Sequence, residues 1–492
     1  MRVDLSRPSG AFARGFVNTP TTLVVGRRAR ARERARKKVV RIIIFIYLLA
    51  IFEGALRKWV LPQFGQYLFF IRDPFLLWVY VIATRHGLWP RKSLFLRISL
   101  GMAAFGVALA AIQSGFGGFE SSQLILAAYG WRNYFLYIPL AFLIGAQFRE
   151  ADLLRVYRWT LWLAIPIAAL IVIQFRAPIG SAINVGIAQS KDLQFRGLGV
   201  DPEHTRPMGT FTSSTGQVAF VTSAFTIFLG LFVARKKLMP TGRIIPLVAG
   251  VAILVCLAFG QSRAAMVECG AVVIASVGFG LISKNHRSRW RATVLPIVLV
   301  AGAATIYPIV FPEGFQVFVH RWETASITES EDGEGGIVGR ALFQFVDFTR
   351  LFDQVPALGY GLGMGGNAST RLGFTIDGVA PGALAESDWA RHMVDVGPIF
   401  GVIYIIFRGA LVSWLAWLAL GAGRRYSNPM PILLFALVGP NLLYGQVTGH
   451  GTVNVYAWLF MGFCIAAAKT SAPAISNTPC INSERSNMVS TR

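Results

Sequence analysis

Three stretches of the chain place arginines beside small or glycine-rich backbone, a combination suited to binding phosphate. The first, RGLGVDPEHTRPMGTFTSS, holds Arg196 and Arg206; the second, FGQSRAAMVE, holds Arg263; the third, VGRALFQFVDFTRLFDQVPALGYGLG, opens with Arg340. Arginine presents a planar fork of donors that matches phosphate oxygens and never loses its charge. Several arginines around one outer pocket would therefore hold a diphosphate. Taken singly, each arginine is more simply interpreted as an anchor at a membrane interface.

The third stretch lies inside the longest polar interruption of the sequence, which runs from Glu313 to Arg391. A loop of this length is usually either functional or disordered. This one contains aromatic residues, a candidate amphipathic helix, the glycine-rich run GYGLGMGG and clustered charge. We therefore expect an ordered, functional loop and include Arg391 among the candidate binding residues. The glycines are not a nucleotide fingerprint, because no soluble strand and helix surround them.

The rest of the chain consists of apolar segments long enough to cross a membrane. Of its 492 residues, 54% are hydrophobic and only 14% are charged, whereas about a quarter of a soluble protein is charged. The sequence predicts an all-α, polytopic membrane protein with about 12 transmembrane helices and a large external loop before the tenth. The predicted spans lie near 41–60, 67–84, 94–115, 121–146, 152–175, 214–234, 243–261, 263–283, 293–312, 393–420, 429–446 and 451–469.

The basic residues indicate the orientation, because Lys and Arg concentrate in cytoplasmic loops. With the N-terminus inside, every short inner loop is basic, whereas the outer turns GFGGFESS and GQVTGHG contain no Lys or Arg. Contact with anionic lipid explains the net charge of +23 more simply than nucleic acid, which is not expected as a partner. The sequence predicts a basic cytoplasmic tail (1–40), followed by spans 1–9 (41–312) with an external loop at 176–213. A large external loop (313–391), spans 10–12 (392–470) and a second cytoplasmic tail (471–492) follow.

Ionisable residues inside predicted spans are functional candidates by default. Glu53 and Arg57 stand four apart, the spacing of a helical ion pair. Arg72 and Asp73 begin the second span at about the same depth. These four residues predict a charge network that ties the first two spans together.

Arg132, in YGWRNYF, lies well inside its predicted span, roughly 16 Å deep at about 1.5 Å per residue. No acidic residue lies within one helical turn of it in the sequence. Two interpretations remain open: Arg132 pairs with Glu53 or Glu268, or it faces a water-filled cavity and binds an anion. We therefore include Arg132 among the candidate binding residues. The cysteines and acidic runs lack metal-ligand spacing, so no metal is expected.

In their order, these motifs resemble the O-antigen ligase and polysaccharide polymerase family. RPMGTF before a span, QSRAA at a turn, GR followed by PALGYGLG, and finally DVGPIFG occur in sequence, with a large outer loop before the tenth span. The resemblance covers roughly 200–410 well and the remainder only in topology. It implies an enzyme of the bacterial inner (plasma) membrane that transfers a glycan from undecaprenyl diphosphate to an acceptor sugar hydroxyl. It implies neither a metal nor a cofactor.

The resemblance also implies roles for individual residues. Arg206 and Arg263 would hold the lipid diphosphate, and Arg340 would place the loop or a phosphate. The family usually has a His-Asn pair 11 residues before the glycine that corresponds to Gly397, and Glu386 with the serine after it stands there instead. Glu386 is therefore the first candidate for the catalytic base, and His392, six residues later, is the second.

The expected function is polymerisation of undecaprenyl-diphosphate-linked repeats into exopolysaccharide or O-antigen. Its expected partners are an acceptor glycan, membrane lipid, and flippase and chain-length proteins. An O-antigen ligase, which passes glycan to the lipid A core of lipopolysaccharide, is the near alternative. A transporter or flippase is an alternative of another class, and would predict inverted repeats with charges near the midplane. Arg132 and Arg408 favour it, whereas the missing repeat and the outward arginines do not.

Overall fold

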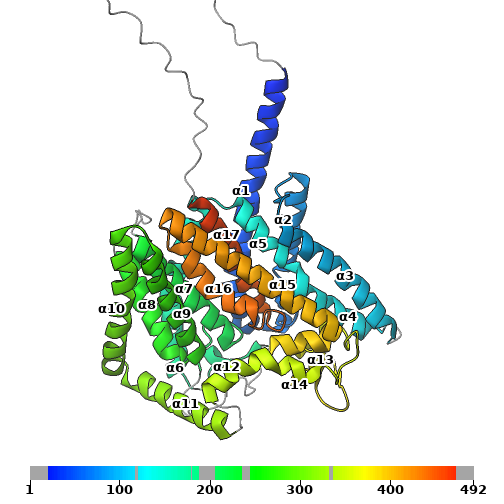
Figure 1. Cartoon of the computed structure of the whole chain (residues 1–492). Helices are drawn as coiled ribbons and strands as arrows, with labels where there is room; N and C mark the ends of the chain where they lie inside the picture. The colour runs from blue at the N-terminus through cyan, green and yellow to red at the C-terminus, as the bar shows by residue number, and fades with distance from the viewer. Residues whose placement is uncertain are drawn as a thin grey trace, which may run out of the picture.

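In the computed structural model, the described residues are 20–116, 120–178, 180–187, 206–234, 244–331 and 336–471. Within these ranges the chain is helical, and its one strand-like pairing is an isolated bridge between Ile376 and Val379. The long helices pack side by side into one bundle (Figure 1). Helix α17 (Gly451–Thr470) is buried along most of its length and forms the middle of this bundle.

Nine of the described helical segments are long and apolar enough to cross a membrane, which confirms an all-α membrane protein. They contain α1 (Pro20–Ala55), α2 (Asp73–Arg85), α3 (Leu94–Phe116), α6 (Glu150–Arg176), α7 (Ser214–Ala234), α9 (Arg263–Ile282), α10 (His286–Val310), α15 (Asp388–Tyr426) and α17. The three other predicted spans hold shorter helices, namely α4 (Ser121–Trp131) with α5 (Ile138–Gln147), α8 (Ile244–Gly260) and α16 (Met430–Leu443). The count of about 12 spans therefore stays a prediction.

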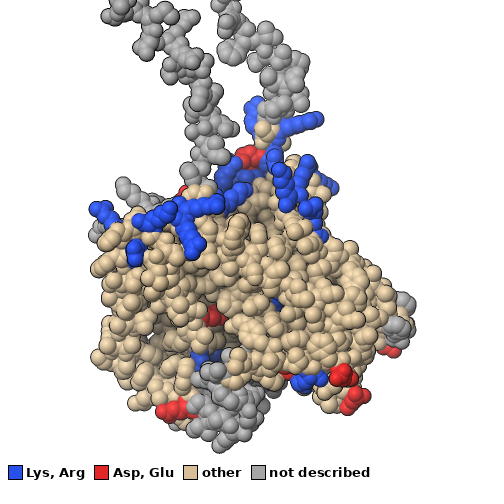
Figure 2. All heavy atoms as spheres, in the orientation of Figure 1, with Lys and Arg blue, Asp and Glu red and all other residues tan. Residues whose placement is uncertain are grey.

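Helix α1 carries the basic run of the N-terminal tail directly into the first apolar segment. The sequence analysis separated a tail ending at residue 40 from this segment, but the structure has one continuous helix. Alanine, arginine and lysine, which dominate the run, are among the strongest helix formers. Arg36 Nη1 lies 2.8 Å from Asp152 Oδ2 and fixes the helix to the start of α6. Figure 2 shows Lys and Arg gathered at this end of the bundle.

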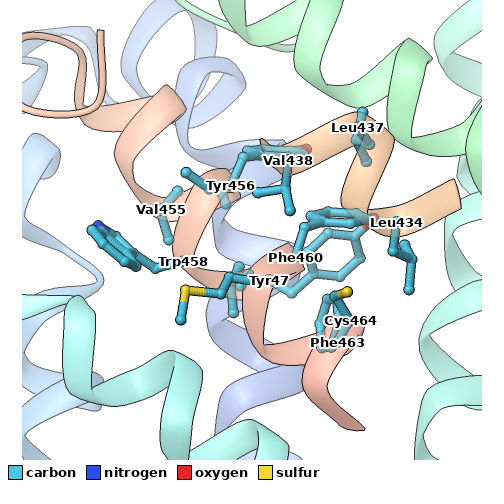
Figure 3. Close-up of a cluster of buried hydrophobic side chains, with 14 of the residues drawn as sticks. Tyr47, Leu434, Leu437, Val438, Val455, Tyr456, Trp458, Phe460, Phe463 and Cys464 are labelled. Carbon is cyan, nitrogen blue, oxygen red and sulfur yellow. The ribbon is translucent and has the colours of Figure 1, made fainter. Parts of the chain in front are cut away.

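The centre of the bundle is a cluster of aromatic and aliphatic side chains from α1, α16 and α17 (Figure 3). Tyr456 and Phe460 stack on each other with ring centroids 5.8 Å apart. Tyr47 of α1 packs edge-on against Phe463, and its hydroxyl lies 2.7 Å from Thr160 Oγ1 of α6. The buried Tyr47 hydroxyl is therefore paired, as the cost of burying a polar group requires.

The long polar stretch from 313 to 391 folds into short helices at the end of the bundle opposite the basic end (Figure 1). These are α11 (Pro312–Glu331), α12 (Gly336–Val346), α13 (Asn367–Arg371) and α14 (Pro381–Leu384), with 3₁₀ turns between them. A small apolar cluster that includes Leu351, Ile376, Met393 and Val394 packs this stretch onto the start of α15. The next helix thus begins at Asp388, slightly before the predicted boundary.

Helix α15 is broken near its start at Gly397, where φ is +80°, and Pro398 follows. A side chain at Gly397 would place its Cβ 2.1 Å from the carbonyl oxygen of Ala357. The break therefore depends on glycine, which reaches positive φ without cost and lets the two backbones touch.

We expect Gly397→Ala to destabilise the protein, by about 1–3 kcal/mol from the backbone conformation alone (φ +80°, ψ +168°), with the clash against Ala357 in addition. Thermal unfolding of the purified protein in lipid nanodiscs would measure the loss. Gly409→Ala is the matched control, because a Cβ at Gly409 of the same helix meets no atom within 4 Å. Equal melting temperatures for the two variants would contradict this account of the break.

Candidate functional site

A cavity of about 250 Å³ with polar and apolar walls lies between α7, α9, α16 and α17. Its lining residues come from the first turns of α7, α9 and α17 and the last two turns of α16, in the part of the bundle nearer α11 to α14. Its polar lining consists of Arg206, Ser214, Thr215, Thr222, Ser223, Ser262, Glu268, Asn441 and Tyr456. A concave site with a few convergent polar groups is the usual form of a small-molecule site.

Arg206 enters this cavity from the segment that precedes α7. That segment is attached to α1: Lys58 Nζ donates to the carbonyl of Gly209 at 2.9 Å, and Thr210 Oγ1 donates to the carbonyl of Ile51 at 2.6 Å. Arg206 Nε is buried and has no hydrogen-bond partner among the described residues. A buried donor without a partner is costly, so this nitrogen is free to bind an acceptor from a ligand.

Arg263, the first residue of α9, stands beside Arg206. Burial and the positive charge of Arg263 both lower the pKa of Arg206, and arginine nevertheless keeps its charge in proteins. The Arg263 guanidinium carbon lies 5.9 Å from the ring centroid of Trp322 in α11. The positive charges of Arg206 and Arg263 act on each other, and a bound anion would relieve this repulsion.

Glu268 lies one to two turns further along α9 and supplies a carboxylate to the same cavity. Its Oε1 accepts a hydrogen bond from Asn441 Nδ2 of α16 at 3.4 Å. Its Oε2 is buried without a hydrogen-bond partner among the described residues, and so is the Tyr456 hydroxyl. The cavity thus holds donors and acceptors that the described residues leave without a hydrogen bond.

Glu268 was not among the residues predicted for the site, although it stands five residues after Arg263 in the sequence, which was interpreted as ion-pair spacing, and was considered as a partner for Arg132. The structure overturns that pairing and the pairing with Glu53. Arg132 makes a two-pronged ion pair with Asp73, with N–O distances of 2.6 and 3.0 Å. It begins a π-helical turn, Arg132–Leu136, which breaks the span between α4 and α5. Arg132 is therefore neutralised and does not line the cavity.

The predicted charge network between the first two spans is confirmed for Glu53, Arg57 and Arg72, whereas Asp73 pairs with Arg132 instead. Glu53 accepts from Arg57 at 3.0 Å and lies 2.9 Å from Arg72 Nε. All three side chains are buried, so the pairing satisfies charges that the membrane interior would otherwise penalise.

Arg391 and His392 belong to a buried network away from the cavity. Arg391 donates from Nη1 to Asp388 at 2.9 Å and from Nε to the carbonyl of Gly365 at 2.8 Å. His392 is fully buried, with Nδ1 2.8 Å from the Tyr134 hydroxyl and Nε2 3.0 Å from Arg408 Nη1. Both ring nitrogens of His392 are thus occupied within the protein.

The remaining predicted residues lie elsewhere. Glu386 is exposed just before α15, and its carbonyl accepts from Gln446 at 3.3 Å; it does not line the cavity. Arg340 belongs to α12, but its side chain is outside the described part of the structure, and Arg196 lies outside the described residues altogether. The described residues contain no group of three His, Cys, Asp or Glu side chains that could hold a metal ion.

No protein-family model matches the chain, and no curated protein matches it. The resemblance in motif order and the roles that it implies therefore stay predictions.

Proposed function

We propose that this chain transfers a glycan from a lipid diphosphate to the hydroxyl of an acceptor glycan, most simply as a polymerase of undecaprenyl-diphosphate-linked repeats. The observation that carries the proposal is Arg206, which lines a cavity inside an all-helical membrane protein and keeps its Nε without a hydrogen bond among the described residues, with the positive charge of Arg263 acting on it. A membrane-embedded site with two adjacent guanidinium groups suits an anionic headgroup on a long apolar chain.

The orientation supports a donor that is used on the outer face of a bacterial inner membrane. Lys and Arg gather at the end of the bundle opposite α11 to α14 (Figure 2), and basic residues mark the cytoplasmic side. The cavity lies toward the other end. About 12 spans, counted with the broken helix α4–α5 and the shorter α8 and α16, would put both termini in the cytoplasm.

The proposed reaction needs electrostatic stabilisation and one proton acceptor. The acceptor oxygen attacks the anomeric carbon of the donor sugar, the bond from this carbon to the phosphate oxygen breaks, and the diphosphate leaves with the electron pair. Arg206 and Arg263 neutralise the charge that develops on the diphosphate. The hydroxyl proton passes to a carboxylate of the protein.

Deletion of the gene in its host tests the function. We expect loss of a surface polysaccharide together with accumulation of single lipid-linked repeats, and restoration of both by the wild-type gene. Normal polymer that is no longer attached to lipid A core would instead indicate a ligase. Unchanged polymer and unchanged lipid-linked repeats would overturn glycan transfer and favour transport.

A further inference from the structure

We infer that Glu268 is the catalytic base of this site, which takes the proton from the acceptor hydroxyl. The inference rests on the proposed function and adds to it the residue that activates the acceptor. Its foundation is geometric, because Glu268 is the one acidic residue among the described residues that line the cavity.

The hydrogen bonding of the Glu268 carboxylate leaves a place for a hydroxyl group of a ligand. Glu268 Oε1 accepts from Asn441 Nδ2, whereas Oε2 is buried and makes no hydrogen bond of normal geometry with the described residues. A buried carboxylate oxygen without a hydrogen bond is costly. A sugar hydroxyl supplies the missing donor, and its position against Oε2 is the position from which a general base removes a proton.

The surroundings of Glu268 suit a sugar rather than a purely apolar ligand. Thr222 and Ser223 of α7 and Asn441 of α16 line the cavity on different sides, and the Tyr456 hydroxyl is a further polar group without a hydrogen-bond partner among the described residues. The stacked rings of Tyr456 and Phe460 form an apolar wall. Apolar walls with a few placed polar groups fix the orientation of a small ligand.

The transfer step balances in protons and electrons with the donor, the acceptor and the side chain of Glu268 alone. The acceptor oxygen forms a bond to the anomeric carbon of the donor sugar, and the carbon–oxygen bond to the diphosphate breaks. The electron pair leaves on the diphosphate, beside Arg206 and Arg263, and the proton moves to Glu268 Oε2. Asn441 keeps the carboxylate oriented through Oε1.

The rival bases are less well placed. Glu386 is exposed at the surface and does not line the cavity. His392 is fully buried and uses both ring nitrogens in contacts with Tyr134 and Arg408. Neither side chain lines the cavity that Arg206 lines.

The test uses the purified full-length chain in lipid nanodiscs and the lipid-linked repeats that accumulate in the deletion strain. We expect Glu268→Gln to lower kcat about 10²–10⁴-fold while binding of undecaprenyl diphosphate stays within about threefold of wild type, because Arg206 and Arg263 are intact. The wild-type rate should fall as the medium is acidified and the base is protonated. This acidic limb should be absent in Glu268→Gln and present, at a lower rate, in Glu268→Asp.

Glu313→Gln, which alters an exposed glutamate outside the cavity, is the matched control and should behave as wild type. If Glu268→Gln does not fold, Glu268→Asp decides: an unchanged kcat would overturn the inference. Wild-type transfer with an undiminished rate in Glu268→Gln, or a loss found only in Glu386→Gln, would overturn the role of Glu268 and leave the proposed function standing. A wild-type chain that neither binds undecaprenyl diphosphate nor transfers glycan would overturn the proposed function itself.

Discussion

Replacing Arg206 by alanine is expected to reduce glycan transfer about 10²–10³-fold, the usual cost of removing one donor that stabilises developing negative charge. Arg206 Nε is buried at the cavity without a partner among the described residues, and it is the nitrogen that the substitution would remove. Binding of undecaprenyl diphosphate should weaken as well, because hydrogen bonds to charged groups contribute about 1.5–3 kcal/mol each. Titration of radiolabelled undecaprenyl diphosphate and the rate of polymer formation measure the two effects separately.

The chemistry of the guanidinium group predicts the behaviour of related variants. Arg206→Lys keeps the charge but loses the planar fork, so we expect an intermediate loss. Arg371→Ala is the control, since Arg371 is an exposed arginine at the end of α13 and should bind and transfer normally. Full activity of Arg206→Ala would show that the cavity does not hold the diphosphate. The Arg206 and Arg263 variants should also be non-additive, because the two side chains share one anion.

Local sequence patterns were sufficient to predict that the protein is helical and to predict one short-range ion pair. Apolar runs fixed the class of the protein, and the spacing of Glu53 and Arg57 predicted their ion pair. The pairing of Arg132 with Asp73 was not predictable in this way, because 59 residues separate them in the chain. Only the packing of the second span against the π-helical turn at Arg132 brings the two side chains together.

The candidate site shows the same division between local and long-range information. Arg206 and Arg263 were found because each stands in a motif with small residues at the edge of a span. Glu268 was missed as a site residue because its environment is set by Asn441, which is 173 residues away. Its position in α9, five residues after Arg263, was the available signal. The position 11 residues before Gly397 predicted Glu386 as the base, but the Glu386 side chain is exposed at the surface.

The start of α15 contains the most densely connected charge of the described structure. Asp388, with no exposed surface, accepts from Arg391 Nη1 at 2.9 Å, from Arg408 Nη1 at 2.5 Å and from Thr448 Oγ1 at 2.8 Å. Arg408 also donates to the carbonyls of Asn441 and Leu442 in α16 and to that of Gly445, which follows the helix. One carboxylate thus holds together α15, the end of α16 and the glycine-rich run of the outer stretch.

Asp388→Asn is therefore expected to cost about 3–5 kcal/mol of stability, as removal of one member of a buried ion pair usually does. The substitution keeps the shape of the side chain but leaves Arg391 and Arg408 buried without their shared negative charge. Thermal unfolding in nanodiscs would measure the loss, and Asp353→Asn, at an exposed position of the same outer stretch, should melt like wild type. Asn441 lines the cavity, and its carbonyl also accepts from Arg408. Binding of undecaprenyl diphosphate should therefore weaken together with stability. A variant that melts normally would show that the two arginines find other partners and that the network does not hold the outer stretch to the site.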